Sequence, residues 1–191
     1  MFQVRFHGRG GQGVVTAAEL LSIAAFKEGK HAQAFPSFGS ERMGAPVVSY
    51  CRIADTEIRS REPVEHPDAL VIQDPTLIHS VDLFSGLDQT GYVLINSRRS
   101  FEELGIADYA AGFPENHFRD VGASEIARRH IGRPLPNAAL LGSLAAMCGK
   151  VSLKAVEEAI AEKFPGQVGA ANAAAAREAF DIAARTEKAH A

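Results

Sequence analysis

Three glycines near the beginning of the chain have the spacing of a dinucleotide-binding turn. They lie in the segment "HGRGGQG" at 7–13, which follows a β-favouring run at 2–6 and leads into a run with helical periodicity at 12–29. Glycine lets another backbone or an anion approach closely, and the first N–H groups of a helix attract phosphate and carboxylate. The candidate ligand-binding residues of this turn are Gly8, Arg9, Gly10, Gly11, Gln12 and Gly13.

The rest of a dinucleotide site is missing from the sequence. Such a site uses an acidic residue about 20 positions further on, at the end of the second strand, to bind the ribose hydroxyls. The run at 31–35 continues as "PSF", without Asp or Glu, and the glycine turn lacks the Gly-Lys-Ser/Thr ending of a P-loop. We therefore expect the glycines to allow close packing of a strand, a helix and a neighbouring chain, with nucleotide binding as the alternative.

No other pattern typical of catalysis or metal binding is found in the sequence. The two cysteines, Cys51 and Cys148, are far apart, so a thiolate-bound zinc ion or iron–sulfur cluster is not expected. The seven histidines show no H-E-x-x-H spacing, and no serine lies in a G-x-S-x-G turn. His7 is interpreted as a structural residue, with a hydrogen bond to a ligand as the alternative. We expect neither a catalytic residue nor a metal site in this chain.

Composition and charge narrow the class of protein. The 191 residues are 46% hydrophobic and 23% charged, with a net charge of −3, which is ordinary for a globular protein. There is no dense basic tract that would indicate binding to nucleic acid, and no apolar run approaches the roughly 20 residues that cross a bilayer. We expect a cytoplasmic protein that binds neither nucleic acid nor a membrane.

The hydrophobic pattern predicts one three-layer α/β domain over residues 1–191. It has a mostly parallel or mixed sheet, a Rossmann-like first β–α–β unit and a helical C-terminal part, with a helical extension at about 166–191. Strands are predicted at 2–6, 31–35, 47–53, 69–74 and 91–97. The turn "ADT" predicts a hairpin over 47–58. Asp74 is expected to cap a helix that begins at Pro75.

A second glycine-containing motif follows the second strand and reads "FPSFGSERMGAPV" at 35–47. Together with "HGRGGQG" and with "PNAALLGSLAA", it resembles the gamma subunits of 2-oxoacid:acceptor oxidoreductases, of which the best known act on pyruvate with ferredoxin. The resemblance covers about residues 2–164. In the family this loop more often reads E-R-R-G or E-x-R-G-G, so Met43 makes the loop less polar here.

The resemblance implies a share in a larger enzyme. Family members oxidatively decarboxylate a 2-oxo acid, in most cases to an acyl-coenzyme A. Thiamine diphosphate and Mg²⁺ are held by alpha and beta subunits, and iron–sulfur clusters by a delta or ferredoxin-like subunit. For this chain the resemblance implies a non-catalytic role beside the active site or the coenzyme A channel. It adds four candidate residues for contact with a partner or an anionic ligand: Glu41, Arg42, Gly44 and Asn137.

The two glycine-containing loops follow strands that we expect to be adjacent. They should therefore meet at the carboxyl edge of the sheet, where open α/β folds bind their ligands. Gln12 and Arg42 would donate hydrogen bonds there, to a partner chain or an anionic ligand. Two alternatives stay open: a free-standing nucleotide-binding oxidoreductase, and a purely structural assembly subunit. The sequence names neither the electron acceptor nor the 2-oxo acid, which could be pyruvate, 2-oxoglutarate, a branched-chain or an aryl acid.

Overall fold

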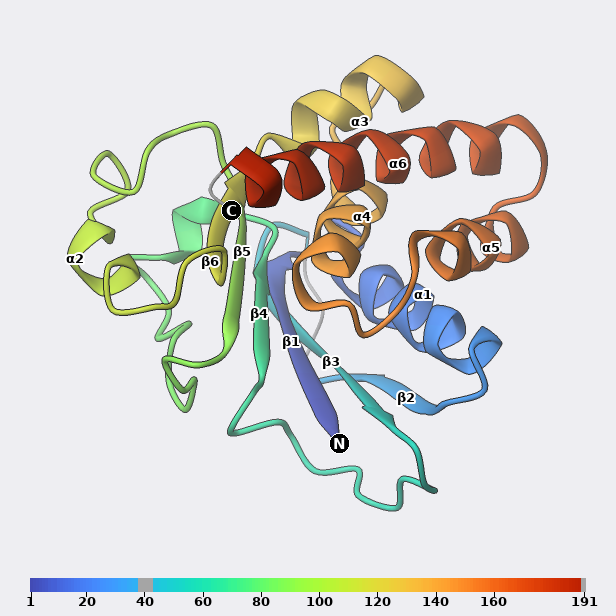
Figure 1. Ribbon diagram of the computed structural model, residues 1–191, viewed down its shortest axis with the longest axis horizontal. Helices are drawn as coiled ribbons and strands as arrows, with labels where there is room; N and C mark the ends of the chain where they lie inside the picture. The colour runs from blue at the N-terminus through green and yellow to red at the C-terminus, as the bar shows by residue number, and fades with distance from the viewer. Residues whose placement is uncertain (38–42, 190–191) are drawn as a thin grey trace.

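Six strands form one mixed sheet at the centre of the protein (Figure 1). The computed structural model describes residues 1–37 and 43–189, with side chains up to residue 185. In spatial order the strands are β2 (His31–Pro36), β3 (Pro46–Ala54), β1 (Phe2–Arg9), β4 (Ala69–Ile72), β5 (Tyr92–Asn96) and β6 (Phe118–Val121). β1, β4, β5 and β6 are parallel, and β3 is antiparallel to both of its neighbours. The α/β class with a mixed sheet is confirmed.

The position of β3 refines the prediction for the first part of the chain. β3 lies between β1 and β2, so the first β–α–β unit has parallel strands that are not neighbours. The predicted hairpin at 47–58 is wrong, because the next strand after β3 is β4. The intervening loop at 55–68 is held to β3 by Arg52, whose guanidinium donates to the carbonyl oxygens of Ser60 (3.4 Å) and Glu62 (2.7 Å). This polar segment is therefore bound by a side chain and not by a strand ladder.

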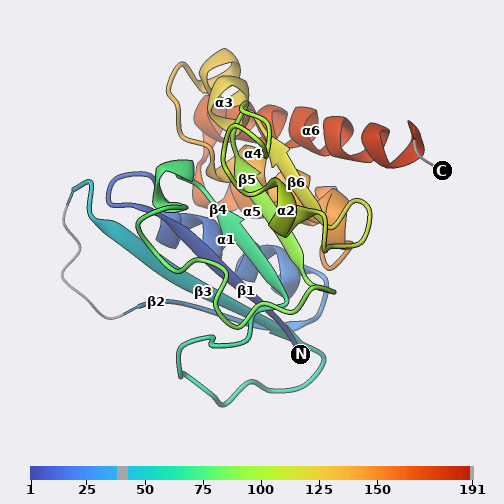
Figure 2. The ribbon, with the colours of Figure 1, turned by 90° about the vertical axis from the view of Figure 1, so that its left-hand side faces the viewer.

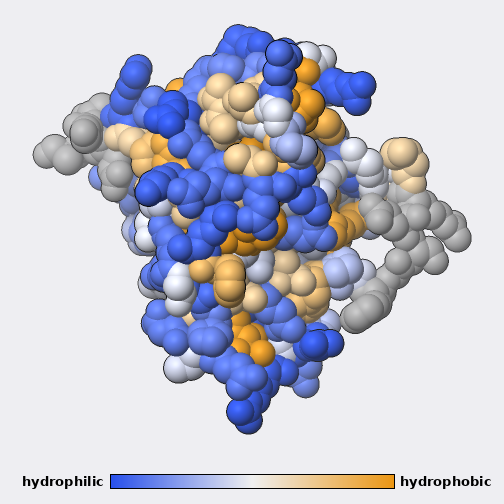
Figure 3. Space-filling view, turned by 90° about the vertical axis from the view of Figure 1, so that its right-hand side faces the viewer, coloured by the Kyte–Doolittle hydropathy of each residue, from blue (hydrophilic) through white to orange (hydrophobic). Residues whose placement is uncertain are grey.

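Helices cover one face of the sheet in two tiers (Figure 1). α1 (Val14–Lys27) and α4 (Asn137–Cys148) pack on the strands, and α6 (Gly166–Ala189) packs on α4 together with α3 (Ala123–Ile131) and α5 (Leu153–Lys163). Ala175, Ala176 and Ala179 of α6 are fully buried in the main core. Figure 3 shows the side of the molecule on which α5 is joined to α6. Apolar residues on this side form separate patches among hydrophilic ones. None of the helices in the described part of the chain could span a membrane.

Loops and short helical turns cover the other face of the sheet (Figure 2). They include the 3-10 turn η1 (Pro75–Leu77) and α2 (Ala107–Ala110), and they enclose a second core that the sheet lines with Leu70, Ile72, Val93 and Ile95. The third of the predicted layers is therefore largely irregular. Its loops are bound to the sheet partly by Arg5, a buried residue of β1 that donates to the carbonyl oxygens of Val64 (3.2 Å), Leu83 (2.8 Å) and Ser85 (2.7 Å).

Candidate functional site

The chain leaves two neighbouring parallel strands, β1 and β4, toward opposite sides of the sheet. From β1 the chain passes through α1 to β2 and β3 on one side, whereas β4 leads to β5 and β6 on the other side. β1 and β4 are neighbours, so the loops after them leave the same edge in opposite directions. In open α/β sheets, ligands bind outside the carboxyl ends of the strands at such a switch point. The carboxyl ends of β1 and β4 are therefore the candidate functional site.

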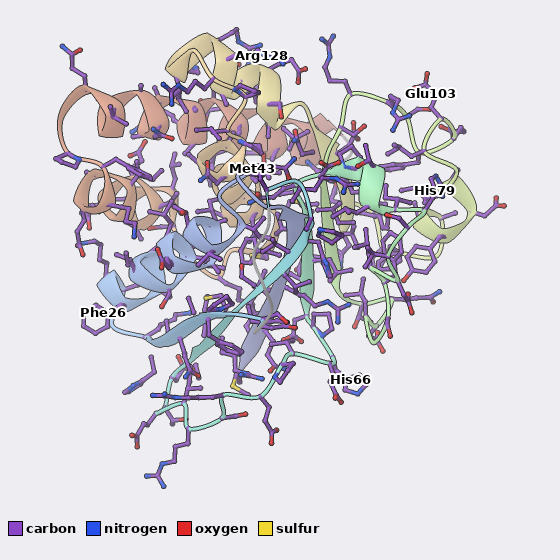
Figure 4. All side chains as sticks on the ribbon, turned by 180° about the vertical axis from the view of Figure 1, so that it is seen from behind. Phe26, Met43, His66, His79, Glu103 and Arg128 are labelled. Carbon is purple, nitrogen blue, oxygen red and sulfur yellow. The ribbon has the colours of Figure 1, made fainter. Side chains whose placement is uncertain are left out.

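The two glycine-containing loops meet at this site. The Gly10 N–H donates to the Ala45 carbonyl oxygen (2.9 Å), and the Gly44 N–H donates to the Gly10 carbonyl oxygen (3.1 Å). Met43 forms a bridge with Gly10, and its side chain is 87% exposed. Figure 4 shows Met43 at this end of the sheet, beside the start of α1. Backbone hydrogen bonds thus fix an exposed apolar residue at the switch point.

A polar network holds the glycine turn against the end of β4. The Gln12 Nε2 donates to Asp74 Oδ2 (2.8 Å), and Gln12 Oε1 accepts from the Arg9 backbone N–H (2.7 Å). Arg9 Nε lies 3.3 Å from the same carboxylate oxygen, and Arg9 Nη1 donates to the Gly44 carbonyl oxygen (3.0 Å). The Gln12 amide, predicted to donate to a partner or an anionic ligand, thus has internal partners for its oxygen and for one of its two N–H groups.

Asp74 organises the loop that follows β4. As predicted, it caps the turn that begins at Pro75: its Oδ1 accepts from the Thr76 backbone N–H (3.0 Å) and from the Thr76 hydroxyl (2.6 Å). Burial acts to raise the pKa of the Asp74 carboxyl, but the hydrogen bonds from Thr76 and Gln12 and the charge of Arg9 outweigh it and hold this pKa below its usual value. Asp74 is therefore ionised at neutral pH and its charge is balanced inside the loop.

Side chains of the same chain occupy the space beside three glycines of the turn. A Cβ atom on Gly8, Gly11 or Gly13 would lie 2.5–2.7 Å from a side-chain atom of Val14, Met43 or Asn137, respectively. Contacts this short force something to move, and the φ of +73° at Gly13 is itself rarely adopted by other residues. The close approach expected of these glycines therefore takes place inside the chain.

Two amide side chains at the site have no hydrogen-bond partner among the described residues. Gln73 directly follows β4 and is 1% exposed, and both its amide atoms are buried and unpaired. Asn137, the first residue of α4, is 7% exposed, and no hydrogen bond of its side chain is found in the described part of the chain. The sequence pointed to Asn137 through its motif. For Gln73 its only signal is a polar residue that ends the apolar run "ALVI".

The structure brings together every predicted site residue that it describes: Gly8, Arg9, Gly10, Gly11, Gln12, Gly13, Gly44 and Asn137. Glu41 and Arg42 lie outside the described residues. The motifs did not reveal Gln73 or the Thr76 hydroxyl, since both follow a strand that carries no motif of its own.

The titratable groups in and near the site are not arranged for acid–base chemistry. His7 is 4% exposed, and burial, reinforced by the positive charge of Arg5, lowers the pKa of His7 to about 3. It is therefore neutral at physiological pH, and its Nε2 has no partner in the described part of the chain. Among the described residues, no group of three or more His, Cys, Asp or Glu side chains could hold a metal ion. The described groups at the site are backbone N–H groups, amides, the Arg9 guanidinium, the Asp74 carboxylate and the Thr76 hydroxyl.

Comparison with known proteins extends over nearly the whole chain. The family model described as "Pyruvate ferredoxin/flavodoxin oxidoreductase" matches residues 3–182. A relative from Thermococcus kodakarensis, a gamma subunit common to pyruvate and ketoisovalerate oxidoreductases, is 47% identical over 95% of this chain and 96% of its own. A pyruvate synthase subunit PorC from Methanothermobacter marburgensis is 46% identical over 95% of this chain and 97% of its own.

Solved structures show the same fold. The pyruvate oxidoreductase subunit PORC of Thermotoga maritima is 37% identical, with a TM-score of 0.79 over 94% of this chain and 95% of that one. The 2-oxoglutarate:ferredoxin oxidoreductase of Magnetococcus marinus has a TM-score of 0.69 over 98% of this chain but only 31% of that longer chain, and at 18% identity it shows the fold alone. With its motifs, its fold and its family match in agreement, this chain belongs to the pyruvate ferredoxin/flavodoxin oxidoreductase family.

Proposed function

We propose that this chain is the gamma subunit of a 2-oxoacid oxidoreductase complex. The complex decarboxylates a 2-oxo acid such as pyruvate oxidatively, normally to an acyl-coenzyme A, and passes the electrons to ferredoxin or another acceptor. The observation that carries the proposal is the 47% identity to a gamma subunit, with 95% of this chain and 96% of the relative covered.

The cofactors of the reaction belong, in this proposal, to partner subunits. Alpha and beta subunits hold thiamine diphosphate with Mg²⁺, and a delta or ferredoxin-like subunit holds iron–sulfur clusters. The donor set of the described residues supports this division, because no His, Cys, Asp or Glu cluster among them suits a metal. Burial also raises the pKa of the Cys51 thiol, which keeps it protonated and inert. The chain contributes shape and hydrogen bonds to the complex.

We place the carboxyl ends of β1 and β4 against the partner subunits, next to the coenzyme A region. The main support is Met43, whose side chain is 87% exposed although backbone hydrogen bonds fix the loop around it. An exposed methionine is an adaptable apolar contact of a kind that binding surfaces often use. Arg9, with a partly exposed side chain, lies in the same loop cluster.

A purely structural role is the second candidate. It is favoured by the filled spaces beside Gly8, Gly11 and Gly13, because glycines that serve internal packing need no ligand to explain them. In that case the loops touch only protein in the complex. The two candidates differ in whether a change at the site alters the Michaelis constant for coenzyme A once the complex has formed.

Reconstitution of the complex tests the proposal. The isolated chain should not reduce a dye with pyruvate, even with thiamine diphosphate and Mg²⁺, whereas the chain mixed with its partner subunits should. Met43→Asp should weaken association at least ~10-fold, about 1.4 kcal/mol. Phe26→Asp is the control, because Phe26 is 74% exposed but lies near the other end of α1 (Figure 4).

Three results would decide against parts of this proposal. Turnover by the isolated chain would contradict the division of labour. Equal effects of the two substitutions would contradict the placement of the interface. If Met43→Asp weakens assembly but the assembled enzyme keeps its Michaelis constant for coenzyme A, Met43 contacts only protein and gives no support for a place next to the coenzyme A region.

A further inference from the structure

Two unpaired amides flank the first turn of α1. Gln73 lies on one side, as a Cβ atom placed on Gly8 shows. Such an atom would lie 3.2 Å from the Cβ of Gln73 and 2.6 Å from a side-chain atom of Val14, the first residue of α1. Asn137 lies on the other side, with its Nδ2 2.7 Å from the corresponding point on Gly13. Buried amides are nearly always hydrogen-bonded, yet neither of these side chains has a hydrogen-bond partner among the described residues.

The backbone makes the same position electropositive. α1 and α4 both begin here, and the first N–H groups of each helix have no partner within their own helix. The aligned peptide dipoles place a partial positive charge at each of the two ends. Neither helix has an acidic residue in its first turn to balance that charge. The nearby carboxylate of Asp74 is already engaged by Arg9, Gln12 and Thr76.

We propose that Gln73, Asn137 and the N-termini of α1 and α4 bind a phosphate group. Its oxygens point in several directions and can accept from two helix ends and two amides at once, which the two oxygens of a carboxylate cannot match. The Gln73 oxygen, which needs a donor, pairs with a protonated phosphate oxygen or with a hydroxyl group beside the phosphate. Neither amide has a hydrogen bond to another described residue that it would have to break to do so.

The site opens to solvent on the side of the glycine turn. Gly11 is exposed and Gly13 is half-buried, so a ligand reaches the first turn of α1 from there. Gln73 lies deeper, is 1% exposed and is shielded from water.

Binding of inorganic phosphate and pyrophosphate to the full-length chain tests the site. Gln73→Leu should raise the melting temperature, because it removes a buried unpaired amide, and should weaken binding of the better anion at least 10-fold. Asn137→Asp should also weaken it at least 10-fold, because a carboxylate repels the anion. Gln33→Leu is the matched control: Gln33 Oε1 is also buried and unpaired, but Gln33 lies in β2 beside Arg52, on the other face of the sheet.

Gln33→Leu should therefore leave anion binding unchanged. The proposal is overturned if neither anion binds the wild-type chain, or if Gln73→Leu and Asn137→Asp both bind them as the wild type does. It is also overturned if Gln33→Leu weakens binding as much as Gln73→Leu.

The assembled complex distinguishes two sources of the phosphate, and this arm alone rests on the proposed function. If the group belongs to coenzyme A, Gln73→Leu should raise the Michaelis constant for coenzyme A about 10-fold and leave that for pantetheine, which has no phosphate, unchanged. If the isolated chain loses anion binding while both constants stay the same, the site binds free phosphate and the coenzyme A placement is wrong. If Gln73→Leu raises the Michaelis constants for coenzyme A and pantetheine equally, the defect is general and the phosphate assignment is overturned.

Discussion

At the scale of single residues, the glycine turn is an internal packing device. Gly8 shows this best, because its φ is unexceptional and only space explains it: a Cβ there would lie 2.6 Å from Val14 Cγ2 and 3.2 Å from Gln73 Cβ. The motif that looks like a nucleotide site therefore brings α1 down onto β1. A substitution at such a position acts first on the fold of the subunit, and only through it on any partner.

Gly8→Ala should destabilise the isolated chain by about 1–3 kcal/mol, the usual effect of an added methyl group in a packed core. Urea unfolding followed by circular dichroism measures this loss. Activity of the reconstituted complex should fall only as far as the folded fraction of the subunit falls. Native stability combined with failed assembly would show instead that the glycine makes room for a partner.

His7 should make the stability of the chain depend on pH. Burial, with the positive charge of Arg5, lowers the pKa of His7 to about 3, whereas the unfolded chain protonates near 6.5. Between these values the unfolded state binds more protons, so stability is complete above pH 6.5 and is lost as the pH falls toward 3. The loss should reach roughly 2–3 kcal/mol at pH 4.5.

His7→Gln provides the comparison, since glutamine does not titrate. Urea unfolding at pH 7 and pH 4.5 should show a smaller loss for this variant than for the wild-type chain. Equal losses in the two proteins would mean that His7 is not the group responsible.

At the scale of elements, the alanine-rich end of the chain is explained by a close helix crossing. A Cβ on Gly142 of α4 would lie 2.0 Å from the carbonyl oxygen of Ala176 in α6, and Ser143 Oγ donates to the Ala179 carbonyl oxygen (3.2 Å). Ala175, Ala176 and Ala179 are fully buried. Small side chains on both helices are what allows α6 to lie against α4.

Gly142→Leu should therefore destabilise the chain by more than about 3 kcal/mol, because the backbones would have to separate. Ala170→Leu, an addition of similar size at an exposed position of α6, should change stability by less than about 0.5 kcal/mol. Denaturant midpoints of the two variants check the difference. A folded Gly142→Leu chain of native stability would contradict the crossing.

The sequence predicted most helices and strands from short-range patterns, but it did not predict the order of the strands in the sheet. Asp74 at η1 was recognisable from its residue type, and the helical C-terminal part, which contains α3 to α6, followed from the hydrophobic pattern. The place of β3 could not be read, because strand order depends on pairing between distant segments. β6 was hidden because two of its four residues, Arg119 and Asp120, are charged.

The same limit applies to the candidate site. Its glycines and Asn137 lie in motifs, so their positions could be predicted. The pairing of Gln12 with Asp74 joins residues that are 62 positions apart and follows from the neighbouring positions of β1 and β4. Gln73 carries no motif, and only its burial without a partner makes it conspicuous.

At the scale of the whole molecule, the two faces of the sheet are held by different forces. One face packs helices through apolar side chains, whereas the loops on the other face depend partly on Arg5 and Arg52, which donate to backbone carbonyl oxygens. Neither arginine has an ion pair in the described part of the chain. The loop layer therefore depends on the planar fork of the guanidinium, which reaches several carbonyl groups at once.

Arg5→Lys should loosen the loop layer and leave the helix layer intact, because an ammonium group cannot span the carbonyl oxygens of Val64, Leu83 and Ser85. Hydrogen exchange should show lost protection at 64–66 and 82–87, with unchanged protection in α4 and α6. A uniform loss across both layers would show that the two faces unfold as one unit.

The insertion of β3 also sets an order for folding on the ribosome. β1 and β2 leave the ribosome first, yet they have no ladder to each other, because the strand that joins them ends only at Ala54. The first strand ladders that the nascent chain can form are therefore those of the group β2-β3-β1. β4, β5 and β6 then attach at one edge in the order of their synthesis, each beside the strand just placed. After β3, no later strand has to insert between two others. The order in which β4, β5 and β6 are synthesised is therefore the order in which they lie in the sheet.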